Sequence, residues 1–292
     1  MVHSDDPQSN QQYALPVGQD LHLCVETRGE PSQPAVVWVA DPLSLHTRHS
    51  WDRQFASALP GAYFLVRYDG RGLGDSSKPE QAEAYTLQAQ AGDLHEVINA
   101  FVGGRFVVVA AGWGGAVLAE YLRCRTVGAQ TAPSGVVLLG AVTQMASAWK
   151  ALAYPDSEVW ANMLAARNEG VRRTTVEGYL NSGCRPGLMP EAQLRQMIEG
   201  ALTLPPAAIR ALFAAYRPYT ERDEVQEGLP IAVPALICHG EDDQRALPLC
   251  ANLAQALFPL SRVHLYPRLG HCLAWDEEPA RDIYTFLESV LA

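Results

Sequence analysis

The chain has 292 residues, 48% hydrophobic and 18% charged, which suits one large domain or a domain with an insertion and argues against extensive disorder. Its 22 Lys and Arg against 32 Asp and Glu give a net charge of −10, and an acidic surface without a basic run excludes nucleic-acid binding. No apolar stretch approaches the roughly 20 residues of a membrane span, and residues 1–12 lack a secretory-signal pattern, so we expect a soluble cytoplasmic protein.

Short runs of consecutive apolar residues recur along the chain and predict buried strands. They are Ala35–Ala40, Ala62–Tyr68, Arg105–Ala111, Gly135–Gly140, Pro234–Cys238 and Ser261–Tyr266. Val- and Leu-rich runs without alternation are typical of parallel strands covered on both faces. Helix-period segments lie between them, at Ala89–Phe101, Ala116–Arg123, Cys250–Leu257 and Glu278–Leu291. This alternation predicts an α/β fold with a mostly parallel sheet flanked by helices.

One region interrupts the alternation. From about Gln144 to Gly228 the sequence contains no convincing strand and four helix-like stretches, Glu158–Glu169, Thr174–Asn181, Glu191–Leu202 and Ala207–Ala215. We therefore predict a core formed by residues 1–143 and 229–292, with a helical cap at 144–228 over one end of the sheet.

The cysteines are scattered and form no close pair. They are Cys24, Cys124, Cys184, Cys238, Cys250 and Cys272. A zinc site needs several ligands at close spacing, so we predict no metal site. We also predict no cofactor. The pattern favours buried free thiols in a reducing compartment.

A sharp turn follows the Arg105–Ala111 strand. It reads Gly112-Trp113-Gly114-Gly115 and leads into a helix-like segment. Small residues let a strand and helix meet closely, and the helix N-terminus offers backbone N–H groups to an anion. The turn has the outline of a nucleophile elbow.

Three further loops follow strands. They read Asp69-Gly70-Arg71-Gly72-Leu73-Gly74-Asp75-Ser76, Gly240-Glu241-Asp242-Asp243 and Gly270-His271. With the Gly114-Gly115 elbow, in this order and spacing, they resemble the loops of the α/β-hydrolase superfamily from about residue 20 to the end, with a helical cap after the sixth strand. The resemblance implies that Asp243 is the acid of a catalytic triad and that His271 is the general base.

The sequence departs from that family at two positions. Gly112 stands where the family has Ser or Asp, and glycine cannot form a covalent intermediate. Ala40-Asp41 stands where the family usually has His-Gly, whose following backbone N–H helps to form the oxyanion hole, and the following residue here is Pro42, which has no N–H to donate. Both departures disfavour hydrolysis through an acyl-enzyme.

These observations lead to one main hypothesis and two alternatives. The main hypothesis is an enzyme of this fold without a covalent nucleophile at Gly112, in which His271 and Asp243 perform acid–base chemistry and Asp41 is an acid partner. Lyase, cyclase, isomerase, cofactor-free oxygenation and water-attack hydrolysis reactions fit. The alternatives are an ester, epoxide or haloalkane hydrolase whose nucleophile has been replaced by Gly112, and a non-catalytic binding protein.

The expected pocket is largely apolar. The backbone amides of Trp113 and Gly114 would stabilise negative charge beside Pro42, and Trp149 and Trp275 would contact the substrate. We expect a hydrophobic small-molecule substrate. The sequence leaves open whether the chain forms a homo-oligomer.

Overall fold

The computed structural model describes residues 9–18, 20–57, 59–124, 132–143, 157–184, 187–221 and 230–292. They form one eight-stranded sheet of order β1-β2-β4-β3-β5-β6-β7-β8. The strands are β1 (Gln11–Pro16), β2 (His22–Arg28), β3 (Ala35–Val39), β4 (Phe64–Tyr68), β5 (Phe106–Ala111), β6 (Gly135–Leu139), β7 (Ala235–Gly240) and β8 (Ser261–Tyr266). The strands from β4 to β8 along the sheet pair in parallel, which confirms the predicted mostly parallel sheet.

Helices cover both faces of the sheet. The helices are α1 (Asp52–Phe55), α2 (Leu87–Phe101), α3 (Gly114–Cys124), α8 (Leu249–Leu257) and α9 (Glu277–Leu291). Alternate residues of the central strands face opposite layers, with Val37 and Val108 packed against α2, α3 and α8. Trp38 and Val109 pack against α1 and α9 on the other face. This burial on both faces explains the unbroken apolar runs in the sequence.

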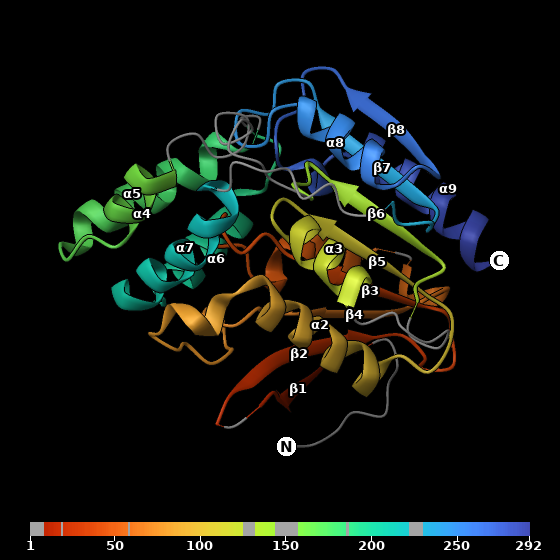
Figure 1. The fold of residues 1–292 in the computed structure, drawn as a ribbon, viewed down its shortest axis with the longest axis horizontal. Helices are drawn as coiled ribbons and strands as arrows, with labels where there is room; N and C mark the ends of the chain where they lie inside the picture. The colour runs from red at the N-terminus through yellow and green to blue at the C-terminus, as the bar shows by residue number, and fades with distance from the viewer. Residues whose placement is uncertain are drawn as a thin grey trace.

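Within the described ranges, four α-helices lie between β6 and β7. They are α4 (Ser157–Leu164), α5 (Glu169–Ser182), α6 (Glu191–Leu202) and α7 (Pro206–Glu221), and they gather at one side of the sheet (Figure 1). Their apolar residues share a buried cluster with Leu43, Leu73 and Trp113, which belong to loops at the carboxyl ends of strands. The predicted helix Glu158–Glu169 is divided between α4 and α5. The division occurs because Asn168 caps the start of α5, where its Oδ1 accepts the Val171 N–H at 3.0 Å.

No single helix in the described ranges is both long and apolar enough to cross a membrane. Glu191–Leu202 and Pro206–Tyr216 meet the length and composition requirement only together, as a pair bent by 91°.

A disulfide joins Cys184 to Cys272, although 88 positions separate them in the sequence. The prediction of buried free thiols is therefore wrong for this pair and for Cys124, which is free but exposed, and it holds for Cys24, Cys238 and Cys250. Sequence spacing could not reveal the bond, because the fold alone brings the end of α5 against the loop after β8. Cys272 also donates its backbone N–H to Gly183 O at 3.1 Å.

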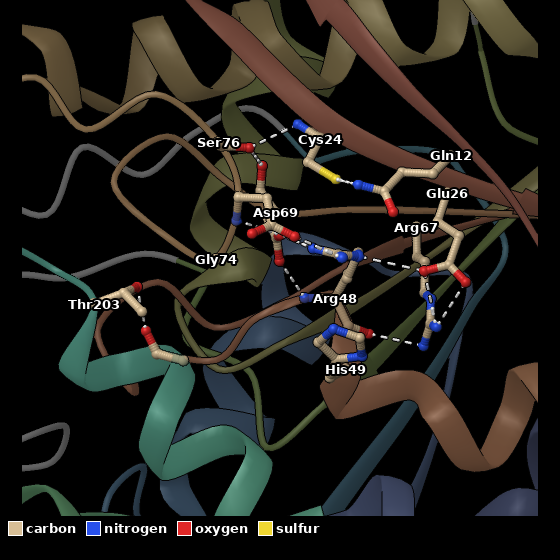
Figure 2. A network of polar contacts seen from close by, with 12 residues as sticks. Gln12, Cys24, Glu26, Arg48, His49, Arg67, Asp69, Gly74, Ser76 and Thr203 are labelled. Carbon is tan, nitrogen blue, oxygen red and sulfur yellow. Dashed lines mark hydrogen bonds and ion pairs between the residues drawn. The ribbon is translucent and has the colours of Figure 1, made fainter. Parts of the chain in front are cut away.

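A buried ionic network holds the loops after β3 and β4 together (Figure 2). The Arg48 guanidinium pairs with Asp69, with Glu26 at 3.3 Å and with Asp75 at 2.8 Å. Arg48 also donates its backbone N–H to Asp69 Oδ1 at 2.7 Å. The aspartates of the Asp69–Ser76 loop thus fix the segment that begins at Asp41.

The same network accounts for the one cluster of candidate metal ligands found among the described residues, Cys24, Asp69 and Asp75. Both carboxylates are already paired with Arg48. Burial raises the pKa of the Cys24 thiol to about 11, so this sulfur stays protonated. The cluster is better explained as an ion-pair network than as a metal site.

Candidate active site

His271 and Asp243 form a buried pair on the loops after β8 and β7. His271 Nδ1 lies 2.8 Å from Asp243 Oδ2. The other oxygen, Oδ1, accepts the backbone N–H groups of Arg245 at 2.8 Å and Ala246 at 3.0 Å. Although burial raises the pKa of Asp243, the charge and hydrogen bond of His271 lower it overall. A fixed carboxylate on Nδ1 orients the ring and directs Nε2 to the opposite side.

Asp41 lies on that opposite side. Its Oδ2 is 3.2 Å from His271 Nε2, and both side chains are almost completely buried. Gly112, at the elbow after β5, has φ +50°, and a Cβ added there would lie 2.9 Å from Asp41 Cβ and overlap its carboxylate. The Asp41 side chain thus fills the space where a side chain at residue 112 would begin.

Local hydrogen bonds fix the Asp41 carboxylate. Oδ1 accepts the backbone N–H groups of Leu43 at 3.0 Å and Ser44 at 3.2 Å, and Oδ2 accepts the Ser44 hydroxyl at 2.7 Å. An aspartate that caps the following turn in this way is a common local motif, and Pro42 fits it because the turn needs no N–H from that residue. These donors favour an ionised carboxylate.

The resting protonation state of His271 differs from that of a simple general base, which begins neutral. Burial alone would lower its pKa, but the charges and hydrogen bonds of Asp243 and Asp41 raise it to about 9. At neutral pH the ring is therefore an imidazolium that donates from both nitrogens. The two carboxylates therefore favour the protonated form of the ring.

A cavity of about 20 Å³, close to the size of one water molecule, lies beside His271. Trp275, Trp51 and Met189 contribute to its largely apolar lining. His46 also lines it, and burial lowers the pKa of His46 to about 3, which keeps this ring neutral.

Trp113, Gly114 and Pro42 were also predicted to belong to the site, and none of them lines the cavity beside His271. Trp113 is buried and packs edge-on against Tyr216 of α7, with ring centroids 4.9 Å apart. Gly114 begins α3, and a Cβ there would lie 2.8 Å from Ala40 O, so this close approach needs glycine. Pro42 lines a different small cavity from the one beside His271. Trp149 lies outside the described residues.

Sequence reasoning missed Ser44, Arg245 and Tyr179. The Arg245 guanidinium donates to Ser44 Oγ at 2.8 Å and stacks on the Tyr179 ring, 3.9 Å from its centroid. The only sequence signal was that Arg245 belongs to the same loop as Asp243. The position of Tyr179 on a helix between β6 and β7 offered no such signal.

The sheet order, the elbow and the His–Asp pair together define an α/β-hydrolase architecture. The model of the alpha/beta hydrolase family matches residues 38–284, and the chain belongs to this family.

Curated relatives in this family have different named activities. A non-heme haloperoxidase of Rhodococcus erythropolis is 25% identical over 249 residues, which cover 82% of this chain and 87% of that protein. "Probable oxidoreductase EphD" of Mycobacterium tuberculosis is 36% identical over 104 residues. That alignment covers 35% of this chain and 17% of the relative, so the chain spans under a fifth of that protein.

Solved structures support the same fold. The esterase RhEst1 of Rhodococcus sp. has a TM-score of 0.80 at 22% identity, covering 97% of this chain and 99% of that one. A bromoperoxidase of Bacillus anthracis has a TM-score of 0.74 at 19% identity, covering 96% and 100%. At these identities the likeness concerns the fold alone.

Proposed function

We propose that the chain is an enzyme that acts on a hydrophobic small molecule by proton transfer, without a nucleophile at residue 112. His271 and Asp41 are the proton-transfer pair, and Asp243 orients His271. One observation carries the proposal. The Asp41 carboxylate occupies the place of the elbow side chain, with Oδ2 3.2 Å from His271 Nε2.

The resting charges define the first step. His271 begins protonated, so its Nε2–H can donate to a substrate oxygen, while ionised Asp41 accepts a proton from a substrate C–H or O–H group. After the step His271 is neutral and Asp41 is protonated, and transfer of that proton from Asp41 Oδ2 to His271 Nε2, 3.2 Å away, restores the resting pair. Elimination, isomerisation, cyclisation and water addition all use such a pair, and base-initiated oxygenation without a cofactor uses Asp41 alone.

The surroundings support an apolar substrate. The α4–α7 helices are the proposed cap, within residues 144–228, over a core of residues 1–143 and 229–292. Trp275 and the indole of Trp113 would contact the apolar body of the substrate, and Trp149 is the further contact proposed from the sequence. Backbone amides at Trp113 and Gly114 would stabilise developing negative charge at the start of α3.

A second candidate is a hydrolase that has lost its elbow nucleophile. The φ of +50° at Gly112 supports it, since the backbone retains the strained turn of an elbow, and curated relatives include hydrolases such as epoxide hydrolase A of Mycobacterium tuberculosis. The position of Asp41 weighs against it, because a serine at residue 112 needs the space that Asp41 fills.

The test is a turnover screen with matched variants. Hydrophobic esters, lactones, epoxides and β-hydroxy ketones are incubated with the wild type, and products are followed by mass spectrometry. For any compound converted, His271→Gln and Asp41→Asn should each lower kcat/KM by at least about 10²-fold. His264→Gln is the control, because His264 pairs with Asp282 at 2.8 Å in a more exposed position.

Three outcomes oppose the proposal. Unchanged turnover in His271→Gln would show that the pair does not act in the reaction. Tight binding of a compound without any conversion would favour a binding protein. Esterase activity that appears in Gly112→Ser/Asp41→Gly, and not in Gly112→Ser, would support the second candidate.

A further inference from the structure

Arg245 is a buried cation that contacts both the loop after β3 and helix α5. Nη1 donates to Ser44 Oγ at 2.8 Å, and Nη2 donates to Ser182 Oγ at 3.3 Å. Its guanidinium also stacks on the ring of Tyr179. Ser182 and Tyr179 belong to α5, whereas Ser44 belongs to the loop that carries Asp41.

The chemistry of arginine fixes the direction of these hydrogen bonds. A guanidinium only donates, so Ser44 Oγ accepts from Arg245. The single Ser44 hydroxyl proton is then directed to Asp41 Oδ2, 2.7 Å away. Arg245 therefore determines which way the Ser44 hydroxyl points, and that hydroxyl holds the oxygen that faces His271.

We propose that Arg245 is a positioning residue for Asp41, which acts through Ser44 and couples the seating of α5 to the proton-transfer pair. This inference rests on the proposed role of Asp41. It adds a residue that acts on Asp41 through the Ser44 hydroxyl.

The main chain and the side chain of Arg245 serve different carboxylates. The backbone N–H donates to Asp243 Oδ1 at 2.8 Å, and this bond survives any substitution except proline. The guanidinium acts on Asp41 through Ser44. A side-chain variant should therefore disturb the Asp41 side of His271 and spare the Asp243 side.

The end of α5 is tied to both loops of the pair. The Tyr179 hydroxyl donates to Leu43 O at 2.8 Å, next to the turn that holds Asp41. Gly183 O accepts the Cys272 N–H one residue after His271, and the Cys184–Cys272 disulfide reinforces this contact. A Cβ at Gly183 would lie 3.1 Å from Arg245 Nε, so helix and guanidinium are in close contact.

The charges around His271 are balanced in this arrangement. The imidazolium lies between the carboxylates of Asp243 and Asp41, and Arg245 supplies a second positive charge behind Asp41. Two neutral rings complete the surroundings, because burial lowers the pKa of both His46 and His239. Losing the guanidinium would leave Asp41 with one fewer fixed neighbour and one fewer compensating charge.

The test observes the two ring protons of His271 by NMR of histidine-labelled protein near pH 7, without substrate. Asp243→Asn and Asp41→Asn assign the Nδ1–H and Nε2–H signals. In Arg245→Met the Nε2–H signal should shift or broaden through exchange, while the Nδ1–H signal stays in place. Ser44→Ala should reproduce the change, and Arg245→Lys, which retains a donor, should restore part of the wild-type signal.

A matched arginine variant separates positioning from folding. Arg173→Met removes an exposed arginine of the same helix, paired with Glu199 at 2.6 Å, and should leave both signals unchanged. Unmoved Nε2–H signals in both Arg245→Met and Ser44→Ala would overturn the proposal, as would equal loss of both ring signals.

Activity separates this inference from the proposed function. With any converted compound, Arg245→Met should lower kcat by about 10²-fold at most, because misplacing a reacting group by about 1 Å has that effect. If His271→Gln abolishes turnover but Arg245→Met leaves the Nε2–H signal intact, the coupling fails and the function stands. If the signal responds but His271→Gln retains full turnover, the function fails and the coupling stands.

Discussion

Asp41 Oδ2 lies 3.2 Å from His271 Nε2, and the carboxylate to which it belongs overlaps the position of a Cβ at residue 112. A residue from the loop after β3 thus replaces the elbow side chain as the partner of the histidine. This relationship links the two departures from the family pattern, since the absence of a side chain at Gly112 is what makes room for Asp41.

The buried imidazolium predicts a stability that falls in alkaline solution. The pKa of His271 is about 9 in the folded chain, above the ordinary 6.5, so the folded state binds the proton more tightly than the unfolded state. The contribution of the imidazolium to the free energy of unfolding is fully present below pH 6.5 and is lost as the pH rises through 9. The difference between the two pKa values corresponds to about 3 kcal/mol of this free energy.

Urea unfolding between pH 6 and 9.5 measures this loss. His271→Gln should be less stable at pH 6 and should show a flatter dependence on pH over that range. The exposed pair His264–Asp282 offers the control His264→Gln, which should retain the wild-type slope. Identical slopes in the wild type and His271→Gln would contradict the assignment of the imidazolium.

Gly112→Ser should be destabilising, and the cost should depend on Asp41. A serine Cβ would overlap the Asp41 carboxylate, and a φ of +50° is unfavourable for a residue with a side chain, so we expect a loss of about 1–3 kcal/mol. Asp41→Gly in the same chain should recover part of that loss. Unfolding of the wild type, both single variants and the double variant gives the coupling free energy. Strictly additive effects would argue that the two side chains do not compete for one space.

The elements that sequence analysis predicted share strong local signals. Buried strands such as β3 and β5 are unbroken apolar runs, and helix α6 matches its predicted limits because its apolar residues recur at helical spacing. The β1–β2 hairpin was missed. β1 is a half-exposed edge strand whose Gln and Pro residues resemble a loop.

Residues of the candidate site were predictable where a family motif fixes their position in the sequence. They were unpredictable where their position depends on contacts between distant segments. His271 and Asp243 follow strands at family positions, and His271 Nδ1 lies 2.8 Å from Asp243 Oδ2. Asp41 was identified only as an unusual residue, because its reach into the space at Gly112 depends on how two loops meet. Arg245 had no sequence signal of its own, because its partners come from segments far apart in the chain.

Reducing the Cys184–Cys272 disulfide should destabilise the chain considerably. The bond closes a loop of 88 residues, for which the loss of loop-closure entropy in the unfolded state predicts about 4.6 kcal/mol. Guanidinium unfolding with and without a phosphine reductant measures the effect, and Cys184→Ser/Cys272→Ser should match the reduced wild type. Cys124→Ser, which removes an exposed free thiol, should behave like the wild type. A reductant effect that persists in the double variant would assign the loss to another cause.

The two aspartates that pair with Arg48 should differ sharply in their contribution to stability. Asp69 is completely buried, so Asp69→Ala leaves the buried guanidinium short of a partner and should cost about 3–5 kcal/mol. The Asp75 side chain is 64% exposed, so Asp75→Ala removes a solvent-screened pair and should cost under about 1 kcal/mol. Thermal and urea unfolding of the two variants measure the difference, with Asp75→Ala as the matched control. Because Asp69 also accepts the Arg48 backbone N–H, Asp69→Ala should increase hydrogen exchange in residues 41–51, and an unchanged exchange pattern there would refute its role in holding the Asp41 loop.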